Sequence, residues 1–80
     1  MVCANVDKIL TIMCDSCMTA TEIATAANVS RTAVYRIRQG YMVKMEIMGR
    51  VCKVLGVKCE EVLDYERIER YRKEMRTIIS

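Results

Sequence analysis

The 80-residue sequence contains no proline, no phenylalanine, no tryptophan and no histidine. Because proline interrupts helices, its absence favours helices that run without breaks. Without Phe or Trp, the core must be built from Ile, Leu, Val, Ala and Met, and the seven Met residues favour adaptable packing. A chain of this length is expected to form one small domain, which buries about 60–65% of the surface that the unfolded chain exposes.

The lack of histidine removes the commonest general base and metal ligand. A nucleophilic cysteine would therefore have no obvious base. The sequence also has no paired carboxylates in an apolar setting and no glycine loop that could cradle a phosphate. We therefore expect a protein that is not an enzyme and that uses no cofactor.

The five cysteines are an odd number, and the sequence has no signal peptide and no long apolar run. These features predict reduced thiols, a cytoplasmic location and no association with a membrane. Cys14 and Cys17 form a C-x-x-C pair, but a zinc site would also need Cys52 and Cys59, at an unusual spacing. Buried or half-exposed structural cysteines are the expected arrangement, and no metal site is predicted.

Residues 18–40 have the pattern of two short helices joined by a tight turn. Thr19 followed by Glu22 is a capping box, which starts a helix by satisfying free backbone N–H groups. Asn28 tolerates the left-handed conformation that ends this helix, and Ser30 is a suitable N-cap for the next one.

The second helix of this pair is expected to run to about residue 38 and to stop at Gly40. Its inward positions are apolar at helical spacing, whereas its outward positions are polar, aromatic and basic. A small face of this kind at the start of a short helix suits the major groove of DNA. The outward residues are Arg31, Thr32, Tyr35, Arg36 and Arg38.

Residues 19–40 resemble the helix-turn-helix of the Cro/lambda-repressor-type (XRE-like) regulators of bacteria and phages. Three positions depart from the family pattern, since its glutamine is Ala20 here, its turn glycine is Asn28 and its late glutamate is Arg38. The positions that match in register are Thr19, Ile23, Ala24, Val29, Ser30, Val34, Ile37 and Gly40.

The resemblance extends to about Asp64 and implies an all-α, five-helix lambda-repressor-like DNA-binding domain over residues 1–65. Apolar spacing independently predicts helices at about residues 5–15 and 45–55, and a short fifth helix after Gly56. Gly49 lies inside the helix at 45–55, where it costs up to about 1 kcal/mol relative to alanine. Close packing against a neighbouring element would account for it.

The resemblance implies a sequence-specific regulator of transcription, with a repressor favoured, whose partner is double-stranded DNA. No acid lies between Glu22 and Glu46, so a positive field is expected over the helix pair. The expected base-reading residues are Arg31, Thr32, Tyr35 and Arg36. The expected phosphate-binding residues are Thr19, Arg38, Tyr41 and Lys44.

Two alternatives stay open at this point. Tyr41 could reach a phosphate or fold back onto the core. The whole chain could also be a protein-interaction module that keeps the fold without specific DNA readout, which Ala20 and the modest net charge of +3 allow. With no separate sensor domain in the sequence, we expect no small-molecule ligand.

Residues 66–80 are expected to add a C-terminal amphipathic helix to the same domain. Two ion pairs at favourable spacing would support it, Glu66 with Arg70 and Glu69 with Lys73. A helix of this length is marginal alone, so its apolar stripe needs a cover. We predict that the stripe forms a homodimer, the alternative being that it folds back on the first and fifth helices. The stripe consists of Ile68, Tyr71, Met75 and Ile78.

Overall fold

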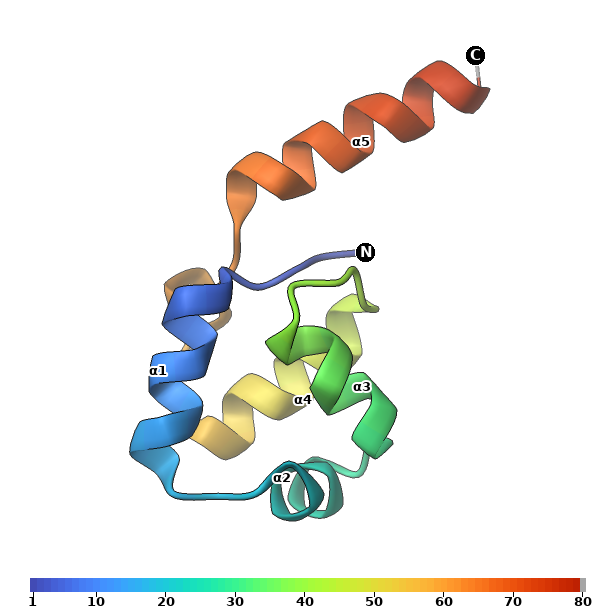
Figure 1. Ribbon diagram of the computed structural model, residues 1–80. Helices are drawn as coiled ribbons and strands as arrows, with labels where there is room; N and C mark the ends of the chain where they lie inside the picture. The colour runs from blue at the N-terminus through green and yellow to red at the C-terminus, as the bar shows by residue number, and fades with distance from the viewer. Residues whose placement is uncertain (80) are drawn as a thin grey trace.

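The structure is a computed structural model that describes the backbone of residues 1–79 and the side chains of residues 1–77. Helices α1 to α4 surround one core, and α5 crosses above them (Figure 1). The all-α fold expected from the sequence is confirmed. In chain order, the elements are α1 (Val6–Ser16), α2 (Ala20–Ala27), α3 (Arg31–Arg38), α4 (Met45–Leu55), the 3-10 turn η1 (Cys59–Glu61) and α5 (Tyr65–Ile79).

The first three helices begin at the capping residues that the sequence indicated. Asn5 and Ser30 each accept a hydrogen bond from the backbone N–H three residues later, both at 3.1 Å. At Thr19 the capping box is complete, because the Thr19 hydroxyl accepts from the Glu22 N–H at 3.1 Å and the Glu22 carboxylate accepts from the Thr19 N–H at 2.9 Å. Local chemistry therefore fixes where α1, α2 and α3 start.

Left-handed residues end three of the helices. Asn28 ends α2 with a φ of 56°, and Gly56 ends α4 with a φ of 73°, as predicted. Cys17 ends α1 with a φ of 57°, which the sequence did not indicate because cysteine has no preference for this conformation. These turns let α2 pack against both α3 and α4 within a short chain.

Residues 1–5 form an extended segment, which we call the N-terminal strap. Val2 and Val43 exchange both backbone hydrogen bonds, at 2.9 and 2.8 Å, and Asn5 donates to the carbonyl of residue 62 at 2.7 Å. The strap thus joins the loop between α3 and α4 to the segment that follows η1. Its buried side chains are Val2, Cys3 and Ala4.

The core is apolar, and within the described side chains no polar or charged residue is buried in it. Each of α1 to α4 contributes at least one fully buried side chain, as does the segment after η1. The aliphatic core expected from the missing Phe and Trp is therefore present. Its largest fully buried members are Ile9, Ile23, Val34, Ile37, Met48, Val51 and Val62.

The expected fifth helix is only the single 3-10 turn η1. Glu61 closes this turn by accepting from the Lys58 N–H at 2.8 Å. The next residue, Val62, is fully buried and uses its carbonyl to bind the N-terminal strap, so the chain leaves helical geometry there. The following chain then starts the longer helix α5.

The expectation that Gly49 packs closely against a neighbour is wrong. A Cβ atom at Gly49 would have no atom within 4 Å outside its own helix and its chain neighbours, so space does not require glycine there. The residue lies in the interior of α4 and has no positive φ.

Gly49→Ala is accordingly expected to raise the free energy of unfolding by up to about 1 kcal/mol, because alanine loses less backbone entropy on folding. Urea denaturation followed by circular dichroism measures this change. The matched control is Gly56→Ala, which places alanine at a φ of 73° and is expected to destabilise. A loss of stability in Gly49→Ala would contradict the open space at this position.

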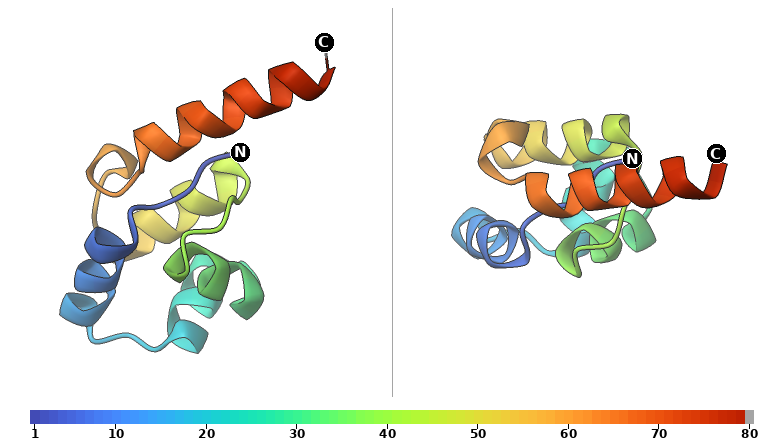
Figure 2. Two further views of the ribbon diagram at one scale, coloured as in Figure 1. Left: turned by 45° about the horizontal axis from the view of Figure 1, so that its top comes forward. Right: turned by 90° about the horizontal axis from the view of Figure 1, so that it is seen from above.

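Helix α5 is attached to the body through its first turns and then leaves it. Ile68 is 3% exposed and belongs to the core of its own chain. The Tyr71 hydroxyl lies 3.9 Å from the Met1 sulfur, and Met75 is exposed. Figure 2 shows the C-terminal half of α5 projecting beyond the other helices. The Ile78 side chain of the predicted stripe lies outside the described side chains.

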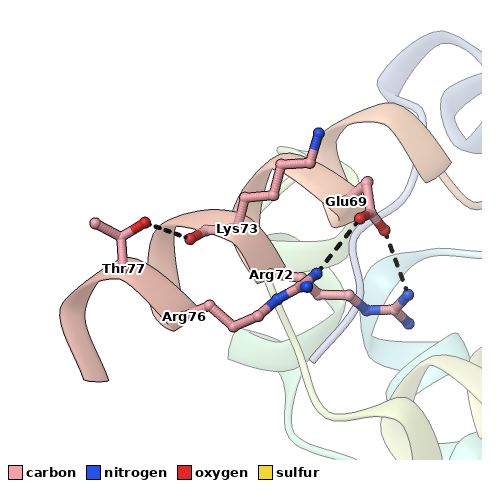
Figure 3. Close-up of polar contacts among 5 residues, drawn as sticks. All are labelled: Glu69, Arg72, Lys73, Arg76 and Thr77. Atoms are coloured by element: carbon pink, nitrogen blue, oxygen red, sulfur yellow. Dashed lines mark hydrogen bonds and ion pairs between the residues drawn. The ribbon is translucent and has the colours of Figure 1, made fainter. Parts of the chain in front are cut away.

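The ion pairs on α5 differ from those expected. Glu69 pairs with Arg72 and Arg76, each at 3.6 Å, on one side of the helix, whereas Lys73 points the other way (Figure 3). Among the described side chains, neither predicted pair is formed. Exposed charged side chains of this length can pair with several neighbours, because the alternative pairs differ little in free energy. The spacing in the sequence therefore does not determine which pair forms.

No helix in the described part of the chain has the length and apolar character needed to cross a membrane.

Candidate nucleic-acid interface

Helix α3 has a buried face and an exposed face. Ala33, Val34 and Ile37 are buried, and they recur at the spacing of one side of an α-helix. The remaining side is open to solvent and faces away from the core. Its exposed residues are the four predicted base-reading residues, Arg31, Thr32, Tyr35 and Arg36, together with Arg38 at the end of the helix.

The turn between α2 and α3 is held from two sides. The Val29 N–H donates to the Ala24 carbonyl at 3.0 Å, and the Val29 side chain packs against the core. Arg50 of α4 donates from Nη1 to the carbonyl of Asn28 at 3.4 Å. This contact braces the turn and was not predicted, because the sequence gives no sign of a partner 22 residues away.

Arg36 connects α3 to the loop that follows it. Its Nη2 donates to the Met42 carbonyl at 3.2 Å, and its guanidinium carbon lies 5.5 Å from the centre of the Tyr41 ring. The Tyr41 ring is 54% exposed, so it does not fold back onto the core. Arg36 and Tyr41 therefore stand together at the edge of the exposed face.

Arg38 and Tyr35 form a similar pair, with the Arg38 guanidinium carbon 5.5 Å from the centre of the Tyr35 ring. Arg38 also lines a surface hollow together with Met18 and Ala20, the two neighbours of Thr19 in sequence. The end of α3 thus lies near the start of α2. Two of the predicted phosphate-binding residues, Thr19 and Arg38, therefore lie near the C-terminal end of α3.

The other two predicted phosphate-binding residues, Tyr41 and Lys44, lie in the loop after α3. Lys44 shares a second hollow with Thr32 and Arg36, which also contains Met1. Lys44 is the N-cap of α4 and makes no side-chain cap hydrogen bond. The first N–H groups of α4 have no partner within the helix, and a helix N-terminus of this kind favours an anion.

The segment that forms this face is basic, and the nearest acid that follows it, Glu46 in the first turn of α4, lines a surface hollow with Lys44 and Met1. No acid occurs between Glu22 and Glu46, whereas Arg31, Arg36 and Arg38 all lie in α3. The Glu22 carboxylate is used within the α2 cap, where the Thr19 N–H lowers its pKa. The ionised Glu22 carboxylate therefore stabilises the fold at a pH above the usual pKa of a glutamate. This stabilisation is lost as the pH falls through the lowered pKa of Glu22.

Thr19→Ala is expected to lower the free energy of unfolding by about 0.5–2 kcal/mol, since it removes the side-chain half of the α2 cap. Thermal unfolding measures the effect as a lower midpoint. Thr21→Ala, two residues later in the first turn of α2 and also exposed, is the matched control and should change little. An unchanged midpoint in Thr19→Ala would mean that the cap contributes nothing.

None of the cysteines lies on α3, although Cys14 and Cys17 line the hollow that contains Arg38. Cys3 and Cys52 are buried, and burial with a hydrogen bond to Cys59 raises the pKa of Cys52 to about 12. Cys14 and Cys17 are exposed, contrary to the buried or half-exposed arrangement expected for them. Within the described residues, no group of three or more His, Cys, Asp or Glu side chains is placed to hold a metal ion.

The comparisons with known proteins agree with this geometry. The family model of the Cro/C1-type HTH DNA-binding domain matches residues 8–67. The matched range contains the whole of α2, α3 and α4 and ends in the first turn of α5. No curated protein and no solved structure matches the chain. Because the family match covers more than half of the sequence, the chain belongs to the Cro/C1-type helix-turn-helix family of DNA-binding domains.

Proposed function

We propose that the protein is a sequence-specific regulator of transcription that binds double-stranded DNA in the cytoplasm and acts as a repressor. The observation that carries this proposal is the exposed face of α3. Four of its exposed side chains stand between two groups of phosphate-binding candidates, while its other side anchors the helix in the core. Occupying a DNA site is enough for repression and needs no further domain.

Base reading is assigned to Arg31, Thr32, Tyr35 and Arg36. Arg31 and Thr32 lie in the first turn of α3, where helix-turn-helix side chains meet base edges. Arginine suits guanine because its fork pairs with O6 and N7 together. Tyr35 is 44% exposed and can touch a thymine methyl group or a sugar.

Phosphate binding is assigned to two groups on either side of the reading residues. Thr19 and Arg38 form one group near the start of α2, and Tyr41 and Lys44 form the other in the loop before α4. Contacts of this kind hold the protein in register on the duplex without reading its sequence. Two such groups would place α3 between the phosphates that border a major groove.

We further propose a homodimer in which the C-terminal part of α5 contributes to the interface. Two-fold dimers of helix-turn-helix domains bind half-sites about 34–36 Å apart. Ile68 is buried in its own chain, so Tyr71, Met75 and Ile78 remain for this role. Met75 lies in the C-terminal half of α5 and is 37% exposed, so a second copy has access to it.

Selection of bound sequences from a random duplex library tests the function directly. The full chain is expected to enrich one sequence, arranged as two related half-sites about one DNA turn apart. Affinity for that site should fall steeply with salt, because bound phosphates release counterions. A library that shows no enrichment, with binding that does not depend on salt, would overturn the proposal and favour a protein-interaction module.

Met75→Lys tests the dimer without removing a core residue. The variant should weaken dimerisation by about tenfold or more, because burial of a methionine side chain is worth about 1.5–3 kcal/mol. Sedimentation over a range of concentrations measures the change. The matched control is Glu74→Gln, which changes the net charge by the same amount at a neighbouring exposed position. If Met75→Lys sediments like the wild type, α5 is not the dimer element.

A further inference from the structure

Helix α5 runs along the loop between α3 and α4, which carries one of the two phosphate-binding groups. A Cβ atom at Gly40 would lie 2.7 Å from Nη1 of Arg67, so the first turn of α5 crosses the start of this loop. One turn later, Tyr71 reaches Met1. Met1 is next to the strap residue that pairs with Val43 in the same loop. The helix therefore advances from Gly40 past Val43.

Met1 links Tyr71 of α5 to the hollow that contains Lys44. Met1, which Tyr71 touches, lines one hollow with Thr32, Arg36 and Lys44. The residues that follow Tyr71 therefore begin beside the edge of the proposed DNA-binding face. Figure 2 shows that this half of the helix extends past the body, so the other helices do not cover it.

This part of α5 is basic. The helix contains five basic and three acidic residues, a net charge of +2. Arg72 and Arg76 lie one turn apart on one side, and Glu69 holds both guanidinium groups at 3.6 Å (Figure 3). Arg76 follows Met75 by one residue, roughly 100° around the helix axis, so it stands beside the apolar stripe and not within it.

We propose that Arg72 and Arg76 bind DNA phosphates next to those held by Tyr41 and Lys44, so that α5 extends the interface along the duplex backbone. The proposal rests on the proposed function, because it names a further part of the same DNA-binding surface. Two arginines in adjacent turns match the spaced negative charge of a duplex strand, and guanidinium groups bind phosphate in a fork. Glu69 pairs with both guanidinium groups and so holds them on one side of α5.

The salt dependence of binding tests this inference in the full chain. The double variant Arg72→Gln/Arg76→Gln is compared with the wild type on the sequence selected from the library. Each lost phosphate contact lowers the slope of log K against log salt by about 0.9, so we expect a slope that is smaller by about 1.8. The ratio of affinities for the selected and a scrambled duplex should stay the same, because phosphate contacts carry no sequence information.

The matched control is Arg70→Gln/Lys73→Gln, which removes the same charge from the side of α5 that faces away from Ile68. Its slope should change by clearly less than that of the first pair. An equal fall in both double variants would mean general attraction without contact, and it would overturn the proposal. Ethylation interference adds a second readout. Ethylation of the phosphates assigned to Arg72 and Arg76 should weaken binding of the wild type but not of Arg72→Gln/Arg76→Gln.

The outcomes separate this inference from the function it depends on. A wild-type chain that binds no duplex overturns both. A wild type that selects a sequence, together with an Arg72→Gln/Arg76→Gln variant of unchanged slope, overturns only the role of α5. Sedimentation must give the same mass for the variant and the wild type, because a smaller mass would assign the effect to the dimer and would also overturn the proposal.

Discussion

Ile37→Ala is expected to lower the free energy of unfolding by about 2–5 kcal/mol. Ile37 is 0% exposed and anchors the inner side of α3 in the core. A domain of this size has a total stability of about 4–12 kcal/mol, so one such cavity removes a large share of it. Because α3 carries the proposed reading face, DNA binding should fall with the folded fraction.

Urea denaturation followed by circular dichroism measures the change in stability. Thr32→Ala is the matched control, since Thr32 lies in the same helix but is exposed, and its effect should stay within about 0.5 kcal/mol. If Ile37→Ala lowers the free energy of unfolding by less than about 1 kcal/mol, the neighbouring core residues must move to fill the cavity left by the missing side chain.

Arg31→Ala is expected to reduce the preference for the selected DNA site by about 1–3 kcal/mol, roughly a factor of 5–150. Arg31 is the first residue of α3, its side chain is exposed, and its loss leaves the core intact. Arg36 is less suitable for this test, because it also holds the Met42 carbonyl and stacks near Tyr41. Removing it would disturb the loop as well as the reading face.

The affinity ratio between the selected and a scrambled duplex measures the preference. Arg38→Ala is the matched control and should weaken binding to both duplexes alike, with a salt slope that is smaller by about 1. If Arg31→Ala keeps the wild-type ratio, the base-reading face has been assigned to the wrong residues. If Arg38→Ala changes the ratio, Arg38 either reads a base or positions Tyr35, since its guanidinium carbon lies 5.5 Å from the centre of the Tyr35 ring.

The helix boundaries that carry a capping residue were predictable because local chemistry sets them. Asn5, Thr19 and Ser30 each bond to a backbone group three residues away, and a sequence pattern can contain that relation in full. Asn28 and Gly56 belong to the few residue types that adopt positive φ readily. The division of α3 into a buried and an exposed face followed in the same way from helical periodicity.

Features that depend on distant partners were not predictable. The strap has no alternating pattern, and its hydrogen bonds go to residues about 40 and 60 positions later. The sequence showed the apolar stripe of the C-terminal helix. It did not show that Ile68 is buried in its own chain whereas Met75 is exposed. The contact between Arg50 and the Asn28 carbonyl has the same origin, since only the tertiary fold brings them together.

The N-terminal strap has a consequence for how the chain folds during synthesis. The strap is made first, but one set of its partners, residues 62–64, is made about 60 residues later. At a synthesis rate of about 5–20 residues per second, roughly 3–12 s pass between synthesis of the apolar strap and synthesis of these partner residues. Nascent chains that end before residue 62 should therefore remain sensitive to protease at their N-terminus, and protection should appear only once nearly the whole domain has been made.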